Sequence, residues 1–153
     1  MIRSIAIGCA SIAWLASSAF AQAPPPGWYV LKSSAQATAY GREASETDLL
    51  LEFDLGASTA TTERSTREFV SLLTTRRECG AFGAVTPDAA GGAVFRAETI
   101  QRALPACTVI LASRGSGETM VIVGKSIAPA GSLEGPRAGA EQLLAMRTGR
   151  VEE

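Results

Sequence analysis

The sequence CTVILASRGSGETMVIV occupies positions 107–123 and contains two short apolar runs separated by a polar, glycine-rich segment. The runs 107–112 and 119–123 are rich in β-branched residues and do not alternate between polar and apolar side chains. Such runs are typical of central strands that are buried on both faces. Gly115 and Gly117 supply the backbone freedom that a turn between them requires. This stretch therefore predicts a β-hairpin inside the sheet.

Another strand is predicted upstream, over residues 48–55. Its alternating positions are Leu49, Leu51, Phe53 and Leu55 on one side and Leu50, Glu52 and Asp54 on the other. This alternation predicts one face on the core and one face largely in water. The acidic group Glu46, Asp48, Glu52 and Asp54 is therefore interpreted as a solvated strand face. A Ca²⁺ site is the alternative, but no loop of suitable spacing accompanies these carboxylates.

A helix is predicted after this strand. Residues 65–68 have the sequence STRE, a capping-box pattern in which Glu68 reaches back to the backbone N–H of Ser65. Apolar residues at 69, 72 and 73 then recur with helical spacing. Gly80 is expected to end the helix in a left-handed conformation.

The remaining elements follow from shorter patterns. Residues 28–31 predict the first strand, and residues 33–40 continue it after a bend as an edge strand. Residues 95–104 fit a second helix that ends at Pro105, with a strand over 94–99 as the alternative. Residues 137–147 fit a short final helix.

Together these elements predict an α+β fold. We expect a two-layer domain whose mostly antiparallel sheet, of about four strands, packs on two or three helices. The predicted divisions are an export signal over 1–23, a proline-rich leader over 24–27 and a single domain over 28–128. A loosely packed C-terminal segment, 129–153, is expected to hold the final helix.

The N-terminus indicates export from the cytoplasm. Arg3 precedes an apolar run over 5–20, and small residues then predict cleavage after Ala21 or Ala23. Retention as a membrane anchor is the alternative, although the run is shorter than the roughly 20 residues that span a bilayer. A lipoprotein site at Cys9 has too short an apolar run before it. We therefore expect a periplasmic or secreted protein with no stable membrane span after cleavage.

Two cysteines remain after cleavage, Cys79 and Cys107. An even pair in an exported protein most simply forms one structural disulfide. Their wide spacing is unlike the C-x-x-C motif of thiol oxidoreductases. We expect this bond to join the end of the first helix to the strand that begins at Cys107.

The composition excludes several chemistries. The chain has no histidine and no asparagine, so Ser-His-Asp catalysis, histidine-based zinc sites and N-linked glycosylation are all excluded. Its 14 basic and 15 acidic residues give a net charge of −1. A balance so close to neutral gives no indication of a nucleic-acid partner.

Two groups of residues are candidates for binding. Arg64 and Arg67 lie near the start of the predicted helix, where an anion could be held, although a solvated face with alternating charges is favoured. Trp28 and Tyr29 are aromatic residues of the kind that anchor interfaces, although such residues more often complete a core. No motif indicates a catalytic residue, a cofactor or a metal.

These observations predict a small exported binding or accessory protein that interacts with another envelope protein and has no catalytic activity. An extended edge strand is a common route to such a partner. A histidine-independent enzyme that uses carboxylate chemistry is one alternative. A structural envelope protein without a discrete ligand is another.

Overall fold

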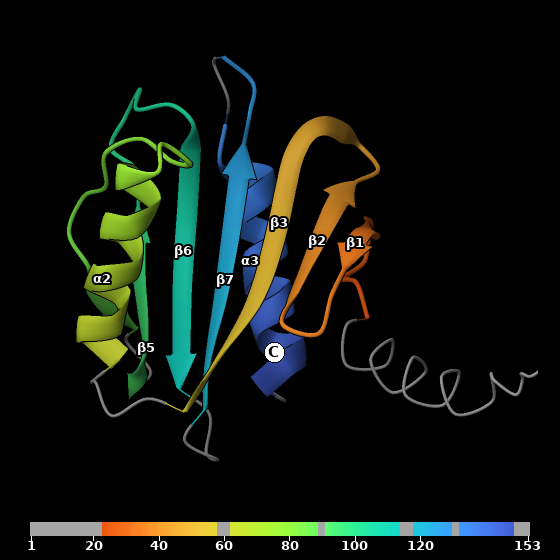
Figure 1. Ribbon diagram of the computed structural model, residues 1–153. Coiled ribbons are helices and arrows are strands. Elements are labelled where there is room, and N and C mark those ends of the chain that lie inside the picture. The colour runs from red at the N-terminus through yellow and green to blue at the C-terminus, as the bar shows by residue number, and fades with distance from the viewer. Residues whose placement is uncertain (1–22, 58–61, 89–90, 114–117, 130–131, 149–153) are drawn as a thin grey trace, which may run out of the picture.

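The computed structural model describes residues 23–57, 62–88, 91–113, 118–129 and 132–148. Seven strands form one antiparallel sheet in the order β1-β2-β3-β7-β6-β5-β4, and one helix lies on each face (Figure 1). The elements are β1 (Trp28–Ser33), β2 (Ala37–Arg42), β3 (Ser45–Ala57), α2 (Thr62–Thr75), β4 (Thr86–Asp88), β5 (Gly91–Glu98), β6 (Ala106–Ser113), β7 (Glu118–Ser126) and α3 (Glu134–Thr148).

The predicted fold class, a sheet of about four strands on two or three helices, is therefore wrong. The sheet has seven strands instead of about four, and the described residues contain two helices. The expected second helix over 95–104 is absent, because β5 (Gly91–Glu98) occupies its first half and pairs with β6. The expected edge strand is also misplaced. β2 (Ala37–Arg42) lies between β1 and β3, so that β1 and β4 form the edges.

The predicted hairpin is confirmed at the centre of the sheet. β6 and β7 pair antiparallel, with Val109 opposite Val123 and Ile110 opposite Ile122. All four side chains are buried. Val109 and Val123 belong to the core under α2, whereas Ile110 and Ile122 belong to the core under α3. Both faces of the hairpin are therefore covered, which explains its continuous apolar sequence.

The predicted alternation of β3 is present, but its polar face is not in water. Leu50 is fully buried under α3, and Asp48 and Glu52 on the same face are less than a tenth exposed. On the other face, Leu51 is only partly buried and Leu55 is exposed. The interpretation of Asp48 and Glu52 as solvated carboxylates is therefore wrong, because both have arginine partners.

Helix α2 begins and ends at other residues than predicted. Its first residue is Thr62, so Ser65 lies inside the first turn and cannot be the capping residue. The left-handed residue after the helix is Arg77, with a φ of 61°, rather than Gly80. Gly80 instead lies against the 99–105 loop, where a Cβ would come within 2.7 Å of the Ala103 side chain.

Helix α3 packs firmly on the sheet, in contrast to the loose C-terminal segment that was expected. Its buried residues Ala140, Leu143 and Leu144 join the core under α3. Gly139 allows the indole ring of Trp28 to approach closely, since a Cβ there would lie 2.6 Å from that ring. Trp28 is therefore a core residue that fixes the start of β1 against α3.

The predicted export signal falls almost entirely on residues 1–22, which lie outside the described residues. Among the described residues, neither helix has the length and apolar character needed to cross a membrane.

Candidate functional site

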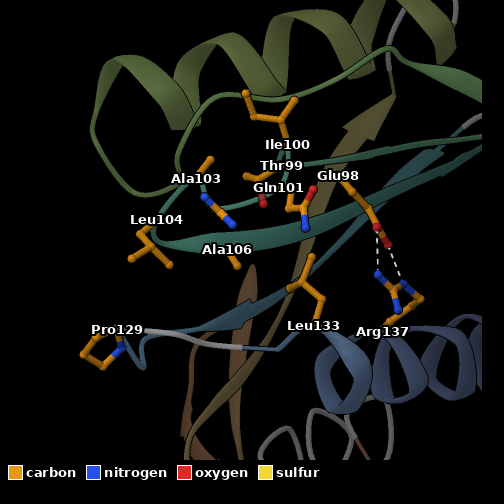
Figure 2. A pocket seen from close by; sticks show the side chains of 11 residues that line it. Glu98, Thr99, Ile100, Gln101, Ala103, Leu104, Ala106, Pro129, Leu133 and Arg137 are labelled. Carbon is orange, nitrogen blue, oxygen red and sulfur yellow. Dashed lines mark hydrogen bonds and ion pairs between the residues drawn. The ribbon is translucent and has the colours of Figure 1, made fainter.

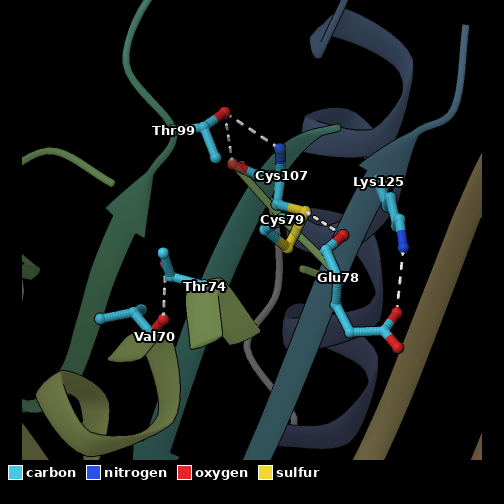
Figure 3. The surroundings of a disulfide bond; sticks show 7 residues. All are labelled: Val70, Thr74, Glu78, Cys79, Thr99, Cys107 and Lys125. Atoms are coloured by element: carbon cyan, nitrogen blue, oxygen red, sulfur yellow. Dashed lines mark hydrogen bonds and ion pairs between the residues drawn. A yellow bond between two sulfur atoms is a disulfide. The ribbon is translucent and has the colours of Figure 1, made fainter. Parts of the chain in front are cut away.

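The predicted disulfide between Cys79 and Cys107 is present, with their Cα atoms 5.9 Å apart (Figure 3). It joins the turn that follows α2 to the start of β6. Beside it, Lys125 on β7 donates to Glu78, with 3.2 Å between Nζ and Oε1. These two contacts fix the C-terminal end of α2 over the sheet.

Helix α2 covers only part of its face of the sheet. It packs on β5 and β6, and Val121 and Val123 of β7 are buried in the same core, whereas Figure 1 shows no helix in front of β3 and β2. A helix is about 10 Å wide and strands lie about 4.8 Å apart, so one helix covers two or three strands. The apolar residues of β3 on this face are therefore left partly exposed.

A groove of about 370 Å³ lies where α2 meets this uncovered region, and we call it the β3 groove. It is lined by Leu51, Phe53, Phe69, Leu72, Leu73, Arg76, Glu78, Cys79, Val123 and Lys125. Phe53 and Phe69 pack against each other in a tilted arrangement, with ring centroids 5.9 Å apart. Apart from one group of charged residues, the lining is apolar.

The charged lining residues gather at one end of the β3 groove. Lys125 lies opposite Leu49 in the sheet and is paired with Glu78. Arg76 follows α2 by one residue, is exposed, and forms no ion pair with any described residue. The groove therefore has one cationic end and one aromatic end.

The outer edge of β1 is a second exposed apolar region. Tyr29, Val30 and Leu31 are consecutive, and 44%, 44% and 51% of their surfaces are exposed. Tyr29 lies over Gly41 of β2, where a Cβ would come within 2.8 Å of its ring. The ring is thus held in place while much of it stays accessible.

The opposite edge of the sheet is protected. β4 has only three residues, and Pro87 at its centre cannot donate a backbone hydrogen bond. Asp88 also carries a charge at this edge, 3.8 Å from Arg96. Short strands, prolines and charges are the usual protection of edges against pairing, so of the two edges β1 is the more open.

The predicted anion site at Arg64 and Arg67 does not assemble as a cationic cluster. Arg64 pairs with Glu68 at 3.2 Å, and Arg67 pairs with Glu63 at 2.7 Å, both along the exposed side of α2. Trp28 is buried and Tyr29 is exposed on the β1 edge. The four candidates therefore do not form one site.

A second cavity, of about 570 Å³, lies between the 99–105 loop and the start of α3 (Figure 2). Arg137 donates two hydrogen bonds to Glu98 at its edge, of 2.7 and 2.9 Å. The hydrogen bonds from Arg137 lower the pKa of Glu98, and the same contact raises the pKa of Arg137. Both groups are held by each other rather than directed into the cavity.

A buried polar cluster joins β2, β3 and the end of α3. Arg147 donates to both carboxylate oxygens of Glu52, at 2.6 and 3.2 Å, and Tyr40 donates to the same carboxylate at 2.8 Å. Burial, followed by the hydrogen bond to Glu52, raises the pKa of Tyr40 well above its usual value. The sequence analysis missed this cluster because its members lie far apart in the chain.

Within the described ranges, no three Cys, Asp or Glu side chains are grouped so that they could hold a metal ion. The carboxylate of Glu52 is engaged on both oxygens by Tyr40 and Arg147. It therefore serves as a structural contact between α3 and the sheet.

Comparisons with known proteins identify the fold alone. No family model matches the chain, and no curated protein matches its sequence. Among solved structures, the chain is similar to a mutant of protein Mog1, with a TM-score of 0.51 and 14% sequence identity. The match covers 82% of this chain and 85% of the Mog1 chain. At this identity, the likeness establishes a shared arrangement of strands and helices and nothing about activity.

Proposed function

We propose that this protein is an exported, non-catalytic accessory module that binds another envelope protein through the free edge of β1. The observation that carries the proposal is the succession Tyr29, Val30 and Leu31, which exposes three apolar side chains on the more open edge of the sheet. The proposal that the protein is exported is supported by the signal-like N-terminus. A disulfide that ties α2 to the sheet suits an oxidising compartment.

The geometry favours an extended partner segment that adds a strand beside β1. In this mode, backbone hydrogen bonds supply affinity, and alternate side chains of the segment supply specificity. Tyr29 provides a rigid aromatic anchor because its ring is already seated on Gly41. A β-bulge between Val30 and Lys32 interrupts the regular register. The bulge limits the added strand to a short segment and opposes open-ended sheet growth.

The test compares substitutions at two positions of similar exposure. Leu31→Lys places a charge on the β1 edge, whereas Ile127→Lys does so at a position that is 53% exposed and lies beyond β7. Each is exported with a C-terminal tag, and proteins that purify with it from the envelope are quantified. We expect one stoichiometric partner, reduced about ten-fold or more by Leu31→Lys and unchanged by Ile127→Lys.

The captured protein is then purified and its binding to the wild type is measured directly. Equal binding by both variants would contradict docking on the β1 edge. The absence of any stoichiometric partner would contradict the accessory function. Thermal unfolding of each variant confirms that the substitution leaves the fold intact.

A further inference from the structure

We propose that the β3 groove binds a linear apolar chain that ends in a carboxylate, a ligand of the fatty-acid class. This site lies on the α2 face and does not depend on the partner proposed for the β1 edge. Three features of the groove support this. It is narrow, its lining changes from aromatic at one end to cationic at the other, and Arg76 at the cationic end forms no ion pair with a described residue.

The shape suits a narrow, extended ligand. Leu51 and Val123 are paired neighbours on the floor, and Phe69, Leu72 and Leu73 of α2 form the facing wall. The volume of about 370 Å³ lies near the lower end of the roughly 300–1,000 Å³ that is usual for ligand pockets. A partner helix, about 10 Å wide with its side chains, would need a broader trough.

The groove has a direction that the strand and the helix share. Along β3, the sheet changes from Phe53 opposite Val121 to Leu49 opposite Lys125, a span of four residues or about 13 Å. Along α2 and into the turn that follows it, the wall changes from Phe69 to Arg76 over seven residues, or about 10 Å. The sheet floor formed by β3 and β7 and the wall formed by α2 and the turn after it are therefore both aromatic or apolar at one end of the groove and cationic at the other.

The charges at the cationic end favour one anionic group. Arg76 and Lys125 carry two positive charges and Glu78 carries one negative charge, which leaves a net charge of +1. Lys125 is already neutralised by Glu78 at 3.2 Å. Arg76 is thus the cation available to a ligand, and a guanidinium is suited to bind a carboxylate with two hydrogen bonds.

Leu72 leaves part of the apolar wall of the groove exposed to solvent. It is 43% exposed and lies between Phe69 and Arg76 on the wall. A ligand chain in the groove would cover it and remove apolar surface from water, at about 25 cal/mol per Å². The apolar chain would thus supply affinity, while Arg76 would select the head group.

The test uses calorimetric titration of the purified exported protein with dodecanoate, dodecanol and dodecyltrimethylammonium, each below its micelle-forming concentration. We expect one dodecanoate per chain and the weakest binding for the cationic amphiphile. Arg76→Gln should weaken the affinity for dodecanoate about ten-fold and change the affinity for dodecanol by no more than about two-fold. Arg67→Gln, on α2, is the control, and we expect it to change the binding of neither ligand, because Arg67 lies outside the groove.

A second pair of variants tests the place of the apolar chain. Leu72→Glu should abolish binding of both dodecanoate and dodecanol, whereas Met146→Glu on α3, with 42% exposure, should abolish neither. Both are exposed helix positions, so the fold should be retained. Dodecanoate binding that survives Leu72→Glu, equal effects of Arg76→Gln and Arg67→Gln, or no binding at all would each overturn the proposal.

Discussion

Arg147 is expected to be the charged residue on which the stability of the domain depends most. Its side chain and that of Glu52 are each only 10% exposed, and α3 is joined through them to β3. Arg147→Met keeps most of the apolar stem but removes the guanidinium. Its hydrogen bonds to Glu52, Tyr40 and the Ala23 carbonyl are lost together, and the Glu52 carboxylate keeps only the hydrogen bond from Tyr40.

The expected magnitude follows from the burial of this pair. Removing one partner of a buried ion pair costs about 3–5 kcal/mol, because the remaining charge is left desolvated. For a domain of this size each kcal/mol corresponds to about 2–4 °C in melting temperature. We therefore expect Arg147→Met to lower the melting temperature by roughly 6–20 °C and to lower the urea midpoint without changing the m-value.

The matched control is Arg64→Met. The pair formed by Arg64 and Glu68 has side chains that are 73% and 64% exposed, and such pairs contribute about 0–1 kcal/mol. The double variant Glu52→Gln with Arg147→Met removes the stranded charge and should recover more than half of the loss. If Arg147→Met cost no more than Arg64→Met, the reasoning that the buried pair holds α3 on the sheet would be refuted.

Three further predictions concern other contacts. Reduction of the Cys79–Cys107 disulfide, which closes a loop of 28 residues, should lower the free energy of unfolding by about 3–4 kcal/mol, and denaturation with and without reductant measures this. Because Arg137 lowers the folded-state pKa of Glu98, their pair stabilises the fold above the unfolded-state pKa of about 4.3, and this stabilisation is lost as the pH falls through the folded-state pKa. The destabilisation caused by Arg137→Gln should therefore be largest at neutral pH and disappear in acid, and an effect that grew in acid would contradict the assignment. Gly139→Ala should lower the melting temperature despite the better helix propensity of alanine, because its methyl group would lie 2.6 Å from the core indole ring.

The sequence predicted those elements whose environment is uniform. The hairpin of β6 and β7 is apolar on both faces. Its two buried strands can therefore be recognised from the sequence without knowing how the strands pair or which helices cover them. The disulfide was predictable because a single pair of cysteines lies beyond the predicted export signal.

The errors on β3 and β5 share a physical cause, namely charged residues that pair between the sheet and α3. Glu52 on β3 looks solvated in the sequence because its partner, Arg147, is 95 residues away. Arg96 on β5 pairs with Glu141 of α3 in the same way. Arg96 and Glu98 lie on the face of β5 that α3 covers, and both have charged partners on α3. Pattern alone does not distinguish a charge in water from a charge that is neutralised across a layer.

The two proposed binding regions were only partly predictable from the sequence. Tyr29 was recognised as a candidate, but the edge that it occupies was assigned to the wrong strand. The β3 groove had no sequence signal, because it arises where the width of α2 is insufficient to cover the sheet. Its residues come from α2, the turn after α2, β3 and β7, and only the fold brings them together.

The most direct test of the proposed function is site-specific photo-cross-linking in the living cell. A photoreactive residue is placed at Val30 on the β1 edge, with Ile127 as the control position of similar exposure. We predict a cross-link from position 30 to an extended segment of one envelope protein, and no such product from position 127. Equal products from both positions, or none from position 30, would contradict the claim that β1 is the docking edge.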